Sequence, residues 1–225
     1  MQRVRSLTSA NVAVRVVCIS RSLGAGGEEI GRLVAERMRF RLVDEQIVAQ
    51  AAEREGLDPK DVASAEQRRG WLTRFFAGTA KGGPDPEMSG FGTVGSPGTG
   101  DSRSTEMYRE LIKEAILETA RRGSAVIVAH AASHALADHD DVLRVFVTAS
   151  PAIRSRRLAK AFELDQAAAM NKAEESDAAR ADYLRRFYNV KLELPTHYDL
   201  VINTDKLSTE EAASLIHAAG FGHRV

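Results

Sequence analysis

Residues 14–38 read VRVVCISRSLGAGGEEIGRLVAERM: a β-branched run, a glycine-rich turn and an amphipathic segment in direct succession. The apolar run at 14–19 predicts a buried strand, and the glycines at 24–27 predict a tight turn after it. Apolar side chains then recur at helical spacing, at Ile30, Leu33, Val34 and Met38. This periodicity predicts a helix with its apolar face toward a sheet, and Gly31 would let the helix lie close to that sheet.

The loop between this strand and this helix has the composition of a phosphate-binding loop. Glycine tolerates positive φ angles, so Gly24, Gly26 and Gly27 would allow successive backbone N–H groups to point at one anion. The positive end of the helix dipole would add to the attraction. A plain strand-to-helix turn without a ligand is the alternative interpretation.

Two loop motifs fit this stretch in part. The P-loop pattern G-x-x-x-x-G-K-[ST] needs a lysine and a hydroxyl after its last glycine, and Gly27 and Glu28 hold those positions if Gly26 is that glycine. The dinucleotide pattern G-x-G-x-x-G has Glu29 at its third glycine position, but Asp44 follows at the distance of a ribose-binding acid. The loop by itself therefore leaves both folds open.

Composition narrows the class of protein. The 225 residues suit one α/β domain with an insertion, and 31 basic residues balance 31 acidic ones, which argues against a general nucleic-acid or membrane-surface binder. The single cysteine, Cys18, lies in the apolar run, which indicates a core residue and a reducing, cytoplasmic location. Arg15 interrupts the candidate apolar run near the N-terminus, so we expect no signal or membrane segment. Residues 1–13 are expected to form a mobile tail.

Further strands and helices alternate along the chain. Apolar strand runs lie at 40–44, 125–129, 143–148 and 200–203. Helices are predicted at 45–55, from Asp58-Pro59 onward, at 104–122 with Gly123 as its C-cap, and at 208–218 with a Ser208–Glu211 capping box. This alternation predicts a doubly wound α/β sheet.

Two arginine-bearing helices are predicted after the strand at 143–148. Ser150-Pro151 begins the first, and Ser176 is expected to cap the second. Their charged residues include Arg154 and Arg157 on the first helix and Asp177 and Arg180 on the second. Such a face is often only solvated. Because guanidinium groups match phosphate oxygens, however, two such helices joined by a short link could close over a nucleotide.

Several separated stretches, taken in order, resemble one family. They read CISRSLGAGGEEIGRLVAERM, RLVDEQIV, SAVIVAHAASHAL, VLRVFVTASPAIRSRR, DAARADY and YDLVINTDKLSTEEA. The set is similar to the cytidylate-kinase-like group of the nucleoside monophosphate kinases, over most of the chain from Val14 to Ala218 apart from the glycine-rich segment. It favours a P-loop kinase fold, because a dinucleotide domain has no reason to carry an arginine-bearing lid after its fourth strand.

The resemblance implies an α/β fold of the P-loop kinase type, with five parallel strands flanked by helices in a single domain over residues 14–225. It implies a monophosphate-binding lobe at 45–123, with a flexible segment at 78–103, and a short helical lid at 162–189. The implied ligands are ATP with Mg²⁺ and a nucleoside monophosphate, with CMP as the first candidate. The sequence identifies no dedicated protein ligand for the metal, no nucleic-acid or membrane partner, and no oligomeric state.

The same resemblance assigns candidate site residues. The phosphate loop for ATP comprises Ser20, Arg21, Gly24, Ala25, Gly26 and Gly27. The candidate catalytic residues are Arg154, Arg157, Asp177 and Arg180, whose arginines would stabilise the transferring phosphoryl group. Asp44 and His130 are candidate contacts to the monophosphate.

The chain departs from the family's pattern at three places. When the loop is aligned with authentic cytidylate kinases, Gly27 stands at the lysine position and Glu29 at the position of the hydroxyl that helps bind Mg²⁺. Glu28 stands where the cytidylate-kinase-like group tends to have an arginine. Near the monophosphate, Ala129-His130-Ala131 replaces a segment whose arginine grips the substrate phosphate. Before the lid's D-x-x-R, Ala173-Glu174 replaces an Arg-Asp pair.

These departures weaken charge neutralisation, and two hypotheses remain. A carboxylate at Glu28 would repel a phosphate unless it holds a metal or turns outward. One hypothesis is a kinase that moves the γ-phosphoryl group of ATP to a monophosphate. The other is a catalytically degenerate nucleotide-binding or regulatory protein on the same fold. A dinucleotide-binding oxidoreductase is a remote third.

Overall fold

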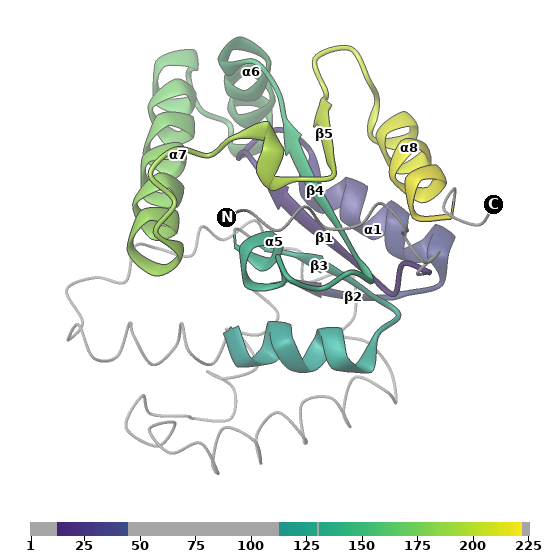
Figure 1. Ribbon diagram of the computed structural model, residues 1–225. Helices are drawn as coiled ribbons and strands as arrows, with labels where there is room; N and C mark the ends of the chain where they lie inside the picture. The colour runs from purple at the N-terminus through teal and green to yellow at the C-terminus, as the bar shows by residue number, and fades with distance from the viewer. Residues whose placement is uncertain (1–12, 45–112, 130, 222–225) are drawn as a thin grey trace, which may run out of the picture. The chain divides into compact units, whose positions relative to one another are not determined.

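The computed structural model describes residues 13–44, 113–129 and 131–221. Within these residues five strands form one sheet in the order β2-β3-β1-β4-β5 (Figure 1). Their bounds are β1 Val16–Arg21, β2 Arg41–Asp44, β3 Ala125–Val128, β4 Val142–Thr148 and β5 Leu200–Asn203. β1 pairs in parallel with β3 and β4, and β4 pairs in parallel with β5. The predicted α/β fold with a five-stranded parallel sheet is confirmed.

Helices connect the strands and flank the sheet. Their bounds are α1 Gly27–Met38, α5 Ala132–Ala135, α6 Pro151–Phe162, α7 Gln166–Tyr188 and α8 Thr209–Phe221, with a 3₁₀ turn, η2, at Pro195–His197. Residues 113–122 are also helical. α1 packs against α8, and α6 packs against α7, as two separate pairs beside the sheet (Figure 1).

β1 is the central strand, and all six of its residues are buried. It begins and ends two residues later than the apolar run at 14–19 predicts. The strand extends because β4 continues beside it, so that Ser20 and Arg21 stay in the parallel ladder. Two polar residues are thereby placed at the carboxyl end of the sheet, which is the end where α/β folds bind their ligands.

The packing of α1 on the sheet follows the predicted periodicity. Ile30 and Val34 are fully buried in the main core. A Cβ atom added to Gly31 would overlap Cγ2 of Val128, so this glycine allows the helix to lie directly on β3. Cys18 is also fully buried, and burial raises the pKa of its thiol. The predicted core role of the cysteine is therefore confirmed.

Two helix starts follow the sequence and one does not. The capping box of α8 is present, because the Ser208 N–H donates to Glu211 Oε2 at 2.8 Å and the Glu211 N–H donates to Ser208 Oγ at 3.2 Å. Pro151 is the first residue of α6, as expected, although Ser150 makes no side-chain cap bond. The prediction that Ser176 caps a helix is wrong. α7 starts at Gln166, ten residues before Ser176.

α7 is a single helix from Gln166 to Tyr188, and Ser176 lies in its interior. Its N-cap is Asp165, whose carboxylate accepts a hydrogen bond from the Ala168 N–H at 2.8 Å. The segment 166–188 is rich in alanine and contains no glycine or proline, so nothing in it stops a helix. A residue that favours helix starts is tolerated inside such a helix, and a better cap upstream decides where the helix begins.

The chain divides into two compact units, residues 1–42 with 122–225 and residues 43–121. In the second unit the structure describes residues 43–44 and 113–121, where Thr119 Oγ1 donates to the Ala115 carbonyl at 2.6 Å. Gly123 follows the helix with φ +66°, as a glycine C-cap requires. Residues 1–12 of the predicted tail, the helices at 45–55 and after Asp58, and the segment 78–103 lie outside the described residues.

No helix in the described part of the chain combines the length and the apolar character that a membrane span needs.

Candidate phosphate-binding site

The loop after β1 has the backbone geometry that its glycines predict. Gly24 and Gly26 have φ angles of +82° and +83°, which a residue with a side chain would adopt only under strain. Gly26 is the N-cap of α1. The loop is anchored at both ends, since the Ser22 N–H donates to the Val147 carbonyl at 2.9 Å and Ala25 is fully buried. The N-terminus of α1 therefore directly follows this loop.

Three buried arginines surround the loop. Arg21 ends β1, Arg154 lies on α6 and Arg180 lies on α7, and their side chains are 9%, 6% and 7% exposed. Among the described residues, every buried charged side chain belongs to this group. Burying three like charges is unfavourable unless something compensates them. We call Arg21, Arg154 and Arg180 the arginine cluster.

Arg154 joins α6 to both the loop and α7. Its Nη1 and Nη2 atoms donate to the two carboxylate oxygens of Asp177 at 2.9 and 2.5 Å. Nη1 also reaches the Leu23 carbonyl of the loop at 3.4 Å. Its Nε is buried and has no hydrogen-bond partner. Arg154 thus retains one unused donor beside the loop.

Arg180 approaches the loop from the other arginine-bearing helix. Its Nη1 donates to the Arg21 carbonyl at 2.9 Å, its Nη2 forms an ion pair with Glu193, and its guanidinium lies 4.5 Å from the centre of the Phe146 ring. Burial lowers the pKa of Arg180, and the positive charges of Arg21 and Arg154 act in the same direction. The Arg180 guanidinium is therefore close enough to the other two arginines to be repelled by them.

Arg21 is paired with the carboxylate that the sequence placed beside the loop. Its Nε lies 2.5 Å from Glu28 Oε1. A Cβ atom added to Gly27 would lie 2.6 Å from Arg21 Cβ, so the Arg21 side chain passes directly over that glycine. Glu28 therefore does not point away from the loop. In this structure its carboxylate neutralises the Arg21 guanidinium.

Arg157 has a different environment from the arginine cluster. Its Nη1 donates to Thr204 Oγ1 at 2.9 Å, and its Nη2 donates to the Thr204 carbonyl at 2.7 Å. Thr204 Oγ1 in turn donates to the Ala25 carbonyl at 2.9 Å. Arg157 therefore ties the end of β5 to the glycine loop, and its guanidinium is used on protein atoms rather than on a carboxylate.

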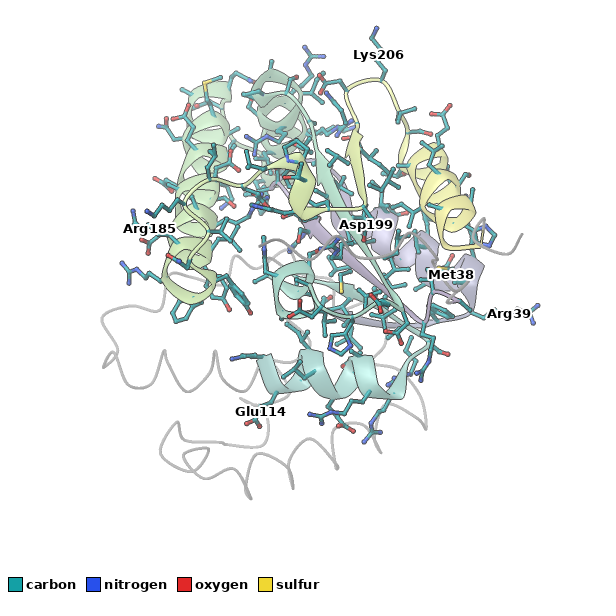
Figure 2. The ribbon with its side chains drawn as sticks, viewed as in Figure 1. Met38, Arg39, Glu114, Arg185, Asp199 and Lys206 are labelled. Carbon is teal, nitrogen blue, oxygen red and sulfur yellow. The ribbon has the colours of Figure 1, made fainter. Side chains whose placement is uncertain are left out.

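Arg185 shows what the outward-facing arginines of α7 do. It is exposed and pairs with Asp182 one turn earlier on the same helix. Figure 2 shows its side chain pointing away from the body of the protein. The solvated-face interpretation thus holds for this side of α7, whereas Arg180 on the other side is buried at the loop.

The sequence prediction missed several partners in the site. Glu193 forms an ion pair with Arg180, and the Tyr198 hydroxyl donates a hydrogen bond to Glu193. Nothing in the spacing of these residues relates them to the loop, because they follow α7 in an irregular segment. The Ser20 hydroxyl also lies 3.1 Å from the hydroxyl of Ser133, in the buried end of the site.

Two residues, Asp44 and His130, are the candidate contacts to the monophosphate. Asp44 is the last residue of β2 and is half-buried. His130 lies outside the described residues. Their assignment remains a prediction.

The donor groups suit a polyphosphate better than a metal ion. Three arginines and the N-terminus of α1 are complementary to phosphate oxygens. Within the described residues, no three His, Cys, Asp or Glu side chains gather as a metal site would require. Glu28 is paired with Arg21 and Glu29 with Arg32. The described residues therefore offer no protein ligand set for Mg²⁺.

The chain matches the model of one family of known proteins. The family model of the cytidylate kinase-like family matches residues 16–206. The chain belongs to this family. The observed strand order also differs from the 3-2-1-4-5-6 order of the dinucleotide fold, so the dinucleotide interpretation of the loop is not supported.

Individual relatives are distant. The cytidylate kinase of Staphylothermus marinus is 28% identical over 99 residues, which are 44% of this chain and 55% of that enzyme. The cytidylate kinase of Methanocaldococcus jannaschii is 26% identical over 123 residues, which are 52% of this chain and 69% of that enzyme. The match thus spans little more than half of the Staphylothermus enzyme.

Solved structures share the fold across almost the whole chain. An uncharacterized protein from Eubacterium ventriosum has a TM-score of 0.61 at 16% identity, with 89% of this chain and 94% of that chain covered. Shikimate kinase from Acinetobacter baumannii, in complex with shikimate, has a TM-score of 0.51 at 11% identity, with 96% and 98% covered. At such identities the likeness shows the P-loop kinase fold alone.

Proposed function

We propose that the protein is a phosphotransferase that moves the γ-phosphoryl group of ATP to a nucleoside monophosphate, with CMP as the first candidate. The observation that supports it most is the arginine cluster. Arg154 and Arg180 come from different helices, and both donate to backbone carbonyls of residues 21–23, where the glycine loop begins. Family membership and the fold point to the same reaction class.

The energetics of the arginine cluster support a functional origin. Replacing a buried ion pair by well-packed apolar residues often leaves stability unchanged or raises it. Three buried guanidiniums at one loop are therefore a poor way to stabilise a fold. They are a suitable way to bind phosphates, because phosphoryl transfer depends on positioning and on the neutralisation of charge.

The proposed reaction uses the chain's residues as follows. An oxygen of the acceptor's monophosphate forms a bond to the γ-phosphorus, and the bond from that phosphorus to the β,γ-bridging oxygen breaks, so that ADP and a nucleoside diphosphate result. The acceptor phosphate is largely deprotonated near neutral pH, so no base is required. The backbone N–H groups of 24–27 would hold the donor phosphates, and Arg154 and Arg180 would stabilise the transferring group.

Other residues have supporting roles in this proposal. Arg157 positions the loop through Thr204 and the Gly24 carbonyl. Asp44 and His130 are retained as candidate contacts to the acceptor, and residues 45–123 are retained as the monophosphate-binding lobe that the family resemblance implies. Mg²⁺ would accompany ATP, held by phosphates and water rather than by a protein ligand set. A cytoplasmic location belongs to the same proposal.

A coupled assay for ADP tests this function, with CMP, UMP, AMP, GMP and dCMP offered in turn. Arg154→Gln should lower monophosphate-dependent turnover by at least roughly 10³, the lower value for an arginine that stabilises a phosphoryl transition state. Arg185→Gln is the matched control, because Arg185 is exposed and pairs with Asp182 on its own helix. Absence of ADP formation with every monophosphate would refute the proposal.

A non-enzymatic nucleotide-binding role is the second candidate. It is favoured by one observation: each member of the arginine cluster is already engaged by a carboxylate, from Glu28, Asp177 or Glu193. Calorimetric binding of ATP and CMP to a protein that shows no turnover would establish it. Turnover that is lost in Arg154→Gln would exclude it.

A further inference from the structure

The glycine loop lacks a lysine at Gly27, and the structure shows what lies in that space. A Cβ atom on Gly27 would lie 2.6 Å from Arg21 Cβ and 2.9 Å from Arg21 Cδ. Real Cβ atoms do not approach other carbons this closely, so no side chain at position 27 can coexist with Arg21 in this conformation. The first turn of α1 is thus built to accommodate the Arg21 side chain.

Arg21 is also held firmly at its backbone. It is the last residue of the buried strand β1, and its carbonyl accepts the hydrogen bond from Arg180. Its guanidinium reaches the N-terminal turn of α1 from the sheet side, where it bonds Glu28. The Arg21 side chain therefore passes over Gly27, the position of the missing lysine, and carries its charge to the first turn of α1.

We propose that Arg21 supplies the cation that this loop lacks at Gly27, and that Glu28 is its displaceable counter-ion. The ligand class is the terminal phosphates of a nucleoside triphosphate. The inference rests on the proposed function, because it names the group in that site which grips the donor. In this inference Glu28 is a counter-ion of Arg21, and not a metal ligand or a side chain turned outward.

The relative exposure of the two partners supports the direction of exchange. The Arg21 side chain is 9% exposed, whereas the Glu28 side chain is 39% exposed. The carboxylate can therefore rotate into water while the guanidinium stays in place. A triphosphate carries more negative charge than a carboxylate and accepts several N–H bonds at once, so it can displace Glu28 from Arg21.

The exchange has a predictable effect on binding. Before the triphosphate binds, Arg21 is neutralised, and the arginine cluster is less repulsive than three bare guanidiniums would be. When it binds, the Arg21–Glu28 bond must break, and Glu28 then remains as a nearby negative charge. Glu28 therefore weakens triphosphate binding, and removing its charge should strengthen it.

Glu28→Gln tests this inference, with calorimetric titration of ATP first without and then with Mg²⁺. We expect ATP without Mg²⁺ to bind about tenfold more tightly to Glu28→Gln than to the unaltered protein, because the charge-assisted bond from Arg21 to Glu28 no longer competes with ATP. Glu29→Gln is the matched control. It removes the same charge from the same helical turn, but Glu29 pairs with Arg32 and does not touch Arg21. Its effect should be twofold or less.

Variants of the arginine complete the design. Arg21→Gln should weaken ATP binding by at least tenfold, and Arg21→Lys should retain part of it. In the double variant Arg21→Gln with Glu28→Gln, the gain from the glutamate substitution should disappear. Because Arg21 is buried, thermal unfolding of each variant is recorded beside the titration, and Glu28→Gln decides the outcome if the Arg21 variants fail to fold.

Three results would overturn the inference. Equal effects of Glu28→Gln and Glu29→Gln would mean that only the general charge of the turn matters. Weaker binding of Mg²⁺–ATP to Glu28→Gln, with unchanged binding of ATP alone, would make Glu28 a metal ligand. Absence of ATP binding in every variant would show that no triphosphate site exists.

Turnover separates this inference from the proposed function. Phosphotransferase activity with identical titrations for the two glutamate variants would keep the function and reject the role of Arg21. Tighter ATP binding to Glu28→Gln in a protein that never forms ADP would keep the role of Arg21 and reject the phosphotransferase.

Discussion

Asp177→Asn tests whether the carboxylates around the loop are counter-ions of buried arginines. The substitution keeps the size of the side chain but removes its charge. The amide offers one acceptor oxygen where Arg154 uses two, and its NH₂ group would face a guanidinium donor. Arg154 would remain buried with much of its charge uncompensated.

The magnitude follows from the exposure of the two partners. Removing one partner of a fully buried ion pair costs about 3–5 kcal/mol. Arg154 is only 6% exposed, but Asp177 is 43% exposed, so water can replace part of the lost interaction. We therefore expect the free energy of unfolding to fall by about 1.5–3 kcal/mol.

Urea denaturation measures the change, provided that the dependence on urea has the same slope for both proteins. Asp182→Asn is the matched control on the same helix. Asp182 pairs with Arg185 and Arg186, which are exposed, so its loss should change the free energy of unfolding by no more than about 0.5 kcal/mol. Equal losses in the two variants would refute the reasoning, because they would show that Arg154 does not depend on Asp177.

Two further predictions concern packing and pH. Gly31→Ala should lower the free energy of unfolding, measured in urea, by about 1–3 kcal/mol through overpacking against β3. Gly220→Ala is the control, because its added Cβ would meet the flexible end of Met38 at 3.1 Å. It should change the free energy of unfolding by less than about 1 kcal/mol. Equal effects would disprove the close approach. Burial, with neighbouring positive charges, lowers the pKa of His134 from 6.5 to about 4, so the folded protein binds fewer protons than the unfolded chain between these values. The contribution of neutral His134 to the free energy of unfolding should thus be fully present above about pH 6.5. It should fall by about 1–2 kcal/mol as the pH approaches 4, after allowance for partial exposure. His134→Gln should remove this part of the pH dependence. An unchanged pH profile in that variant would contradict the assignment.

The strands were predictable because each is a short apolar run in the sequence. Their ends were less so, and β1 shows the reason. Ser20 and Arg21 are polar, and they belong to the strand because β4 extends beside them. Similarly, Ser176 has the local chemistry of a helix cap, but the alanine-rich segment around it continues as helix from Asp165. In both cases neighbours in space or upstream in the chain outweighed a local preference.

The sequence indicated the arginines of the candidate site, but it did not indicate two of their three carboxylate partners. Resemblance to the family indicated Arg21, Arg154 and Arg180, and the structure places all three at the loop. It did not indicate that Glu28 and Glu193 would neutralise two of them. Such pairs form across the fold between residues without a fixed sequence spacing, so no local pattern reports them.

Periodicity, β-branched runs and glycines act over a few residues, so they are sufficient to indicate the class of fold and the position of the loop. Which arginines face that loop depends on how distant parts of the chain pack together. Arg180 and Arg185 lie five residues apart on α7 and therefore point roughly 140° apart around the helix. One is buried at the loop and the other is solvated. Helical spacing separates the two faces, but the packing of α7 against α6, together with the hydrogen bond from Arg180 to the end of β1, determines which face lies inside.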